Sequence, residues 1–225
     1  MPLAIVFGGG GVRGAFQAGV WAEIGPKLRP DFVIGSSIGA LNAWATTRLT
    51  PAQLAQWWLE LAPTRLWPRQ TKPLSELITA ISKRPVCQPW PALAVATRLP
   101  MRRAHVVTLT PDNAHDWLLA STAMPGWFAP QVIAQEYFVD GGVANDLPVA
   151  IAKDLGATQI VAISALGLGP TPQLGETPVL TPPNHTGAMF DFAKSHRQRL
   201  LEAGERAGAA WLTSAQAQML LASSF

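Results

Sequence analysis

A serine lies at the centre of a short glycine-flanked pattern, Gly35-Ser36-Ser37-Ile38-Gly39. The pattern fits G-x-S-x-G, in which the glycines allow a sharp turn that holds the serine hydroxyl clear of the backbone. Asp31 to Ile34 predicts a strand before the turn, and residues 38–49 predict a helix after it. Free N–H groups at a helix start favour a developing negative charge. Ser37 is therefore a candidate nucleophile, and a purely structural turn is the alternative.

A glycine-rich segment, Gly8 to Gly14, connects an expected strand at Leu3 to Phe7 with an expected helix at Ala15 to Ile24. Consecutive residues without side chains expose backbone N–H groups, which together bind an anion. The segment predicts either an oxyanion hole for acyl transfer or the phosphate loop of a dinucleotide fold, because Gly9-x-Gly11-x-x-Gly14 also fits G-x-G-x-x-G.

The second strand separates these two interpretations. A dinucleotide fold has an acidic residue about 20 positions further on, at the end of strand two. This sequence has Gly35-Ser36-Ser37 there. We therefore prefer the oxyanion hole, and a non-catalytic anion- or nucleotide-binding module that uses the glycine-rich loop is the alternative.

A serine hydroxyl needs a base before it can act as a nucleophile. Asp140 is the preferred base, because it ends an expected strand at residues 136–139 and precedes two glycines that let other groups approach. An isolated Asp-Gly pair predicts only a turn. The chain order also permits a triad of Ser37, Asp140 and His196. His196, however, falls on the apolar face of an expected helix over residues 189–211, where buried structural histidines are common.

Four segments in this order resemble the patatin-like phospholipase family: Gly9 to Gly14, Gly35 to Gly39, Ala120 to Gly126, and Asp140-Gly141-Gly142. The resemblance covers residues 3 to 165. It implies a three-layer α/β/α fold with a mainly parallel central sheet, and lipid acyl esters as substrates. It also implies a Ser37 and Asp140 dyad without histidine, and no metal or cofactor.

The same resemblance implies an oxyanion hole in the glycine-rich segment, with Gly9, Gly10, Gly11 and Arg13 as its candidate residues. The amides of Gly10 and Gly11 are the expected donors. Arg13 has two candidate roles, fixing the glycine loop or meeting a phosphate, and we expect the first.

The elements that position these residues alternate between strand and helix, which predicts an α/β core in one domain over residues 1–225. The later elements are expected at residues 104–109 (strand), 116–124 (helix), 149–155 (helix) and 159–164 (strand). A proline-rich segment at about residues 63–100 predicts a cap, and residues 167–183 predict a long loop.

Composition is compatible with lipid contact, since 48% of residues are hydrophobic and 14% are charged, against about 25% charged in ordinary domains. Residues 65–103 contain eight basic residues against Glu76 alone. This basic stretch is the basis of a third alternative, a peripheral membrane or nucleic-acid binder. A solvated basic face is the plainer interpretation, and we expect no nucleic-acid partner. Trp67 and Trp90, in the same stretch, suit either a membrane interface or an irregular core.

The location of the protein is expected from three further features. Cys87 is the only cysteine, which excludes an intramolecular disulfide and makes a reducing compartment the default. No basic residue precedes the first apolar run, so no signal peptide is expected. No run of about 18 apolar residues predicts a transmembrane helix. We expect a cytoplasmic protein that contacts anionic membranes peripherally; its acyl specificity and oligomeric state are not predicted.

Overall fold

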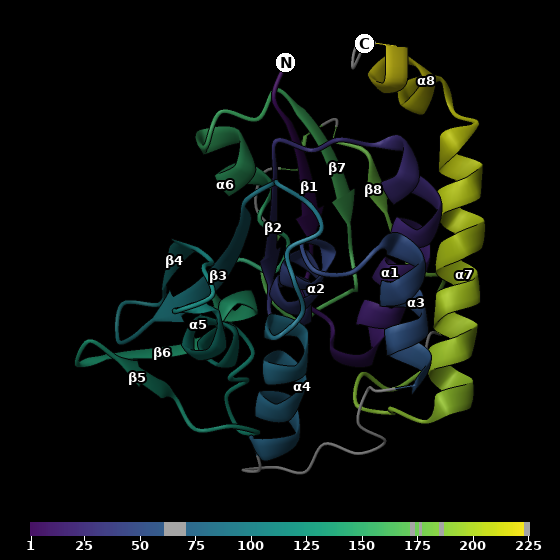
Figure 1. Cartoon of the computed structure of the whole chain (residues 1–225). Coiled ribbons are helices and arrows are strands. Elements are labelled where there is room, and N and C mark those ends of the chain that lie inside the picture. Colours follow the sequence, from purple (N-terminus) through teal and green to yellow (C-terminus); the bar gives the residue numbers. More distant parts are fainter. Residues whose placement is uncertain (61–70, 172–173, 176, 185–186, 223–225) are drawn as a thin grey trace.

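The computed structural model describes residues 1–60, 71–171, 174–175, 177–184 and 187–222. Their strands form one mixed sheet in the order β5-β6-β3-β2-β1-β7-β8, with β4 paired to β3 (Figure 1). The strands are β1 Leu3–Phe7, β2 Phe32–Ser36, β3 Ala92–Arg98, β4 Arg103–Thr108, β5 Gln131–Ile133, β6 Glu136–Asp140, β7 Gln159–Ile163 and β8 Val179–Leu180. The α-helices are α1 Gly14–Ile24, α2 Ile38–Thr46, α3 Pro51–Glu60, α4 Lys72–Ser82, α5 Ala114–Ser121, α6 Val149–Asp154, α7 Lys194–Leu212 and α8 Ala215–Ala222.

Parallel pairing dominates the centre of the sheet. β1 pairs with β2 and β7, β2 with β3, and β7 with β8, all in parallel. The β3–β4, β3–β6 and β5–β6 pairs are antiparallel and extend one side. The prediction of a mainly parallel sheet is therefore confirmed.

Helices cover both faces of the sheet. Successive side chains of each strand point to opposite faces, so a strand that is apolar throughout needs packing partners on both sides. Leu3, Ile5 and Phe7 of β1 pack in a large core with α1, α2, α3 and α7. Ala4 and Val6 pack on the other face, in a smaller core that includes α6. These layers confirm the expected α/β/α architecture (Figure 1).

β3 corrects the predicted extent of the proline-rich cap. Residues 92–98 are not cap residues; they form a buried strand between β2 and β4. Its sequence, Ala92 to Arg98, alternates small and branched residues directly after Pro91, so that the surrounding prolines obscured the strand pattern. Residues 92–98 therefore belong to the sheet and not to the expected cap.

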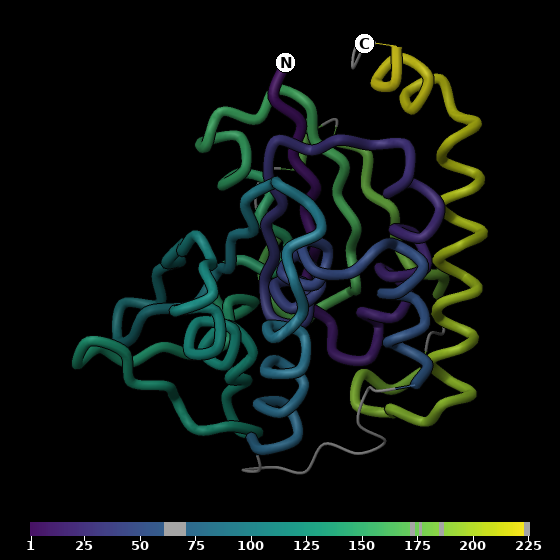
Figure 2. Tube along the Cα trace, in the orientation of Figure 1, coloured from purple at the N-terminus to yellow at the C-terminus, as the bar shows by residue number. Residues whose placement is uncertain are grey.

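The structure describes one of the two tryptophans of the basic stretch, Trp90, and not the other, Trp67. Trp90 is buried in the core, where its ring contacts Trp21 edge-on and its Nε1 donates to Thr46. Residues 61–70, including Trp67, Arg65 and Arg69, lie outside the described residues. The chain trace shows that Met1 and the described end of α8 lie at the same end of the molecule (Figure 2).

Candidate functional site

Ser37 lies in a sharp turn between β2 and α2. Its backbone has φ 56° and ψ −128°, which is an uncommon conformation for a residue with a side chain. The turn is tight, since a Cβ on Gly39 would overlap the carbonyl oxygen of Phe7, and one on Gly35 would overlap Gly39. The sequence pattern around Ser37 thus forms the turn that its two glycines predicted.

The pairing of β3 explains why Asp140 meets Ser37. β4 occupies one edge of β3, so β2 and β6 share the other edge. Ser36, the last residue of β2, is in register with Val95, and Asp140, the last of β6, is in register with the next residue of β3. The carboxyl ends of two strands that are far apart in sequence therefore meet end to end.

The two side chains form a direct hydrogen bond, in which the Ser37 hydroxyl donates to Oδ2 of Asp140 over 2.5 Å. Oδ1 of Asp140 accepts the amide of Gly142 at 2.8 Å. Burial raises the pKa of the Asp140 carboxyl to about 6, although both of these hydrogen bonds act in the opposite direction. At neutral pH Asp140 is therefore mostly ionised and can accept the serine proton.

The segment Ala120 to Gly126 holds both members of this pair. The Ser37 amide donates to the Ser121 hydroxyl, which in turn donates to the carbonyl of Val95. Two residues further on, the Ala123 carbonyl accepts the amide of Asp140. This third sequence segment thus positions the pair without contributing a reacting group.

The glycine-rich loop lies beside Ser37 with two unused donors. In the described part of the chain, the amides of Gly10 and Gly11 have no hydrogen-bond acceptor. The Gly9 amide, by contrast, donates to the carbonyl of Asp146 at 3.0 Å. Gly10 has φ 154°, and a Cβ there would overlap the carbonyl of Ala165, so no other residue fits without strain.

A buried polar network supports this loop from beneath. Gln17 donates to the carbonyls of Gly8 and Ile163. Asn42 of α2 donates to Gln17 and accepts the indole N–H of Trp58. The loop is therefore fixed to the helix that begins after Ser37.

Arg13 and His196 lie apart from the serine and aspartate pair. The Arg13 guanidinium donates to the carbonyls of Leu166 and Gly187, and so ties the glycine loop to two distant segments. His196 lines a separate polar hollow, with its Nδ1 2.8 Å from the carbonyl oxygen of Asp191. The structure does not bring His196 to Ser37 or Asp140.

Ser37 stands between a larger cavity and a small apolar hollow. The cavity has a volume of about 350 Å³, and the hollow about 50 Å³. The cavity is lined by Gly9, Gly10, Ser37, Met124, Pro125, Asp140, Gly142, Val143, Asp146, Gly167, Leu168, Gly169, Pro170 and Met189. The hollow is lined by Gly11, Ser37, Ile38, Leu74, Thr122, Met124, Phe128, Asp140, Phe190 and Phe192.

Asp146 is a site residue that the sequence analysis missed. It is buried in the cavity wall, and burial together with the charge of Asp140 raises the pKa of its carboxyl to about 7, against the opposing amide of Gly167. The sequence offered a weak signal, a carboxylate six residues after Asp140. Its burial depends on loop residues 166–170, which are distant in sequence.

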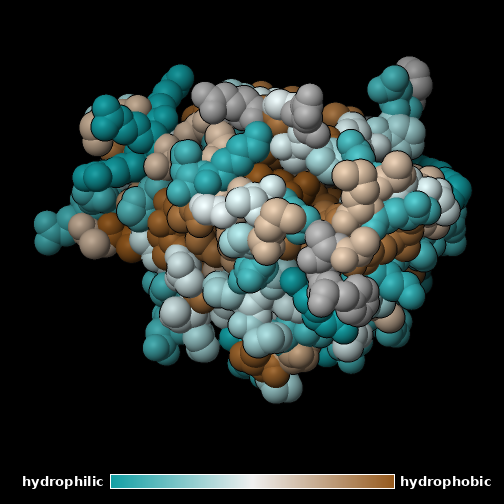
Figure 3. Space-filling view, turned by 90° about the horizontal axis from the view of Figure 1, so that it is seen from above, coloured by the Kyte–Doolittle hydropathy of each residue, from teal (hydrophilic) through white to brown (hydrophobic). Residues whose placement is uncertain are grey.

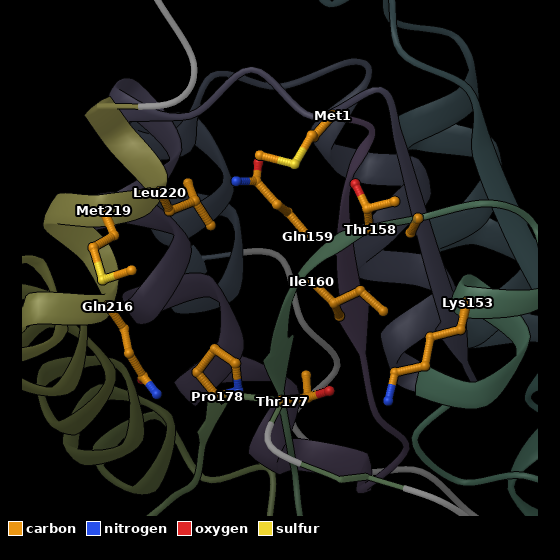
Figure 4. A pocket seen from close by; sticks show the side chains of 11 residues that line it. Met1, Lys153, Thr158, Gln159, Ile160, Thr177, Pro178, Gln216, Met219 and Leu220 are labelled. Atoms are coloured by element: carbon orange, nitrogen blue, oxygen red, sulfur yellow. The ribbon is translucent and has the colours of Figure 1, made fainter.

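A larger cavity of about 530 Å³ lies at the other end of the sheet, near the start of β7. Met1, Ile160, Pro178, Met219 and Leu220 surround it with apolar side chains (Figure 4). Figure 3 looks onto this end and shows apolar surface sunk between hydrophilic residues. Among the described residues that line it there is no serine, cysteine, histidine or acidic side chain, so it is not the candidate catalytic site.

The described residues hold neither a membrane-spanning helix nor a metal-binding cluster. None of their helices combines the length and the apolar character that a membrane crossing requires. No group of three or more His, Cys, Asp or Glu side chains is arranged there to hold a metal ion.

Known proteins resemble this chain in sequence and in fold. The patatin-like phospholipase family model matches residues 5–105 and 101–153, which is more than half of the chain. Patatin-like phospholipase domain-containing protein 7 of Mus musculus is 26% identical over 185 residues, and protein 6 of Homo sapiens is 28% identical over 182. Neuropathy target esterase sws of Drosophila melanogaster is 27% identical over 183 residues. Each match covers 72% of this chain but only 13% of the relative.

The solved structure of VipD from Legionella pneumophila has a similar fold, with a TM-score of 0.59 at 12% sequence identity. The similarity covers 94% of this chain and 66% of that one. At this sequence identity the similarity supports the fold alone. The extent of the sequence match decides the family: the chain belongs to the patatin-like phospholipase family.

Proposed function

We propose that the chain is a serine hydrolase that cleaves the acyl esters of lipids, with Ser37 as nucleophile and Asp140 as base. The observation that carries the proposal is the 2.5 Å hydrogen bond from the Ser37 hydroxyl to the Asp140 carboxylate, at the junction of the cavity and the hollow. No histidine stands between the two groups, so the proton passes directly to the carboxylate.

In the proposed reaction, Asp140 accepts the proton of Ser37 while Oγ attacks the ester carbonyl. The tetrahedral intermediate collapses when its bond to the alcohol oxygen breaks, and Asp140 returns the proton to that oxygen. Water then attacks the acyl-serine, again with Asp140 as base, and the intermediate releases the free acid and restores Ser37. Asp140 thus serves as base and acid in both halves.

The oxyanion forms where the amides of Gly10 and Gly11 have no other acceptor. Gly9 does not share this task, because its amide is bonded to Asp146. It holds the loop in place, as Arg13 does through the carbonyls of Leu166 and Gly187. Rigid donors need little reorganisation when the negative charge develops.

A lipid substrate agrees with the surroundings of Ser37 and with the names of the similar proteins, which are phospholipase domain proteins and an esterase. Phe128, Phe190 and Phe192 line the hollow and suit an acyl chain. Leu168, on the cavity wall, has 83% of its surface exposed. An apolar side chain at such a mouth favours contact with a lipid surface, which makes peripheral membrane binding part of the proposal.

The alternative, a nucleotide-binding module, is less well supported. A phosphate bound at the glycine loop would share the cavity with Asp140 and Asp146. None of the described side chains that line this cavity is cationic. Two buried acids and no cation disfavour a bound dianion.

The test is hydrolysis of p-nitrophenyl butyrate by the wild type and by Ser37→Ala, Asp140→Asn and His196→Ala. We expect activity to be lost in the first two and kept in the third. Ser195→Ala is the matched serine control, since Ser195 is exposed at the start of α7. Circular dichroism checks that each variant is folded.

Two results would contradict the proposal. Hydrolysis that persists in Ser37→Ala excludes Ser37 as the nucleophile. Loss in His196→Ala, with the fold intact, replaces the dyad with the triad that the chain order permits.

A further inference from the structure

A second acid, Asp146, is built into the wall of the proposed catalytic cavity. Its carbonyl accepts the amide of Gly9, and its own amide donates to the carbonyl of Pro170. It is 3% exposed. The backbone is therefore fixed on both sides, and the carboxyl is held against the glycine loop.

Three glycines make room for this carboxyl. A Cβ on Gly9 would lie 2.6 Å from Oδ1 of Asp146, and one on Gly167 would overlap both carboxyl oxygens. A Cβ on Gly142 would lie 3.0 Å from Oδ1 of Asp146 and 3.1 Å from Oδ1 of Asp140. The two acids therefore approach within about 6 Å across Gly142.

The groups that face Asp146 come from three loops and from β6. The loops contribute backbone: Gly9, Gly142, and the amide of Gly167, which donates to the carboxyl. β6 contributes Asp140. The guanidinium of Arg13 is directed at the carbonyls of Leu166 and Gly187. Asp140 and Asp146 are the acidic side chains among the described residues that line the cavity, and no Lys, Arg or His is among those residues.

Two buried carboxyls this close do not both ionise easily. Asp140 accepts hydrogen bonds from Ser37 and Gly142, which stabilise its negative charge. Asp146 has the one amide of Gly167, and burial and the charge of Asp140 raise its pKa to about 7, above that of Asp140 at about 6. Between a pH of about 6 and a pH of about 7, Asp140 is therefore mostly ionised while Asp146 keeps most of its proton.

Among the described residues that line the cavity, a protonated Asp146 is also the only further polar side chain. Apart from Ser37 and Asp140, the lining consists of glycine, proline, methionine, valine and leucine. The O–H of Asp146 is thus the side-chain donor available to an oxygen of the substrate on this side of Ser37.

We propose that Asp146 determines specificity for the alcohol part of the ester. Its protonated carboxyl donates a hydrogen bond to an uncharged oxygen of that alcohol, and the site rejects alcohols that carry an anion next to the ester. The inference rests on the proposed function. It names the substrate class as esters of uncharged polyols.

The experiment compares two soluble esters, 1-butyrylglycerol and its 3-sulfate, which keeps a single negative charge across the pH range used. In the wild type at pH 8, kcat/KM is expected to be about 100-fold lower for the sulfate, as for like charges about 6 Å apart at an effective dielectric constant of about 20. At pH 5.5 the ratio narrows, because Asp146 is neutral. This comparison needs no variant.

Asp146→Asn replaces the O–H donor with an N–H donor that does not ionise. For 1-butyrylglycerol, the wild-type kcat/KM rises as Asp140 ionises and falls above a pH of about 7. The variant loses this fall, is about tenfold faster than the wild type at pH 8, and accepts the sulfate better. Asp146→Ala also loses the fall but is slower than Asp146→Asn at every pH, because it has no donor.

Asp154→Asn is the matched control, an exposed acid at the end of α6, and is expected to follow the wild type. Equal wild-type rates for the two esters at pH 8 would overturn the inference. So would an unchanged pH profile in Asp146→Asn. Either result would leave the proposed hydrolase intact, whereas hydrolysis that survives Ser37→Ala would remove the proposed function itself.

Discussion

The two ends of the sheet each carry a cavity, and the larger one is at the end without the candidate chemistry. The amino-end cavity has about 530 Å³ and the carboxyl-end cavity about 350 Å³. Both have mostly apolar walls. The difference lies in the residues at the two ends: the carboxyl ends of β1, β2 and β6 lead into the glycine loop, the Ser37 turn and Asp140. Among the described residues, no serine, histidine or acidic side chain lines the amino-end cavity.

This difference follows from the direction of the strands. Ligands of open α/β sheets bind outside the carboxyl ends, where loops with free amides and helix starts converge. α2 begins directly after Ser37, and Gly10 and Gly11 leave β1 at the same edge. Position in the topology is therefore a better guide to function here than cavity volume.

The largest expected difference between the two ends of the sheet is tested by changing one polar side chain at each end. Ser37→Ala is expected to lower kcat for p-nitrophenyl butyrate by at least about 10⁴-fold, because the nucleophile is gone. Lys153→Ala, in the wall of the amino-end cavity, is expected to change it less than about twofold. A loss of comparable size in Lys153→Ala would mean that the amino end takes part in the reaction.

The next effect tests the base. Asp140→Asn keeps the shape of the side chain and its contact with Gly142, but cannot take the proton of Ser37. We expect kcat to fall about 10³-fold. In the wild type the rate rises with pH through about 6 as Asp140 ionises. If the residual activity of Asp140→Asn rises with pH in the same way as the wild-type activity, the group that ionises near pH 6 is not Asp140.

How far the sequence predicts these features depends on the range of the interactions involved. Ser37, its glycines and the loop from Gly8 to Gly14 are local patterns, in which steric demands act on neighbouring residues. The family resemblance added the pairing of Asp140 with Ser37 without a histidine, and the layers of the fold. In physical terms, Asp140 meets Ser37 only because β6 continues the edge of β3 beyond β2.

Two features were beyond the sequence analysis for the same reason. β3 lies in a proline-rich stretch, where the surrounding prolines obscured its alternating pattern, and its burial comes from strands on both sides. Asp146 looks like a polar turn residue in the sequence. Contacts with Gly9 and with loop residues Gly167 to Pro170 bury it, and those partners are revealed by the fold alone.

The third prediction concerns stability and compares Asp146 with Asp154, an acid near the amino end of the sheet. The pKa of Asp146 is about 7 in the folded protein, above the ordinary 3.8. With respect to this group, the folded protein is most stable below pH 3.8, and its stability falls as the pH rises from there through about 7. Asp146→Asn removes this loss. Relative to the wild type, its free energy of unfolding is expected to increase by about 3 kcal/mol between pH 5 and pH 8.

Urea unfolding at the two pH values measures this change. Asp154→Asn, at an exposed position near the start of β7, is expected to show no such pH-dependent gap. If the free energy of unfolding changes with pH by the same amount in both variants, burial of Asp146 does not destabilise the folded protein at high pH.

The smallest effect concerns the acyl chain and compares one apolar wall at each end. The hollow beside Ser37 has about 50 Å³, which limits the chain that it holds. Phe128→Ala opens it, while Ile160→Ala opens the amino-end cavity instead. Each added methylene that becomes buried contributes about 0.8 kcal/mol.

We therefore expect Phe128→Ala to raise kcat/KM for p-nitrophenyl octanoate relative to the butyrate by about tenfold, since part of the longer chain becomes buried. Ile160→Ala should leave this ratio unchanged. Because the ratio compares two substrates of one variant, a fraction of misfolded protein does not affect it. If Ile160→Ala shifts the ratio and Phe128→Ala does not, the acyl chain occupies the larger cavity, and the assignment of the two ends is reversed.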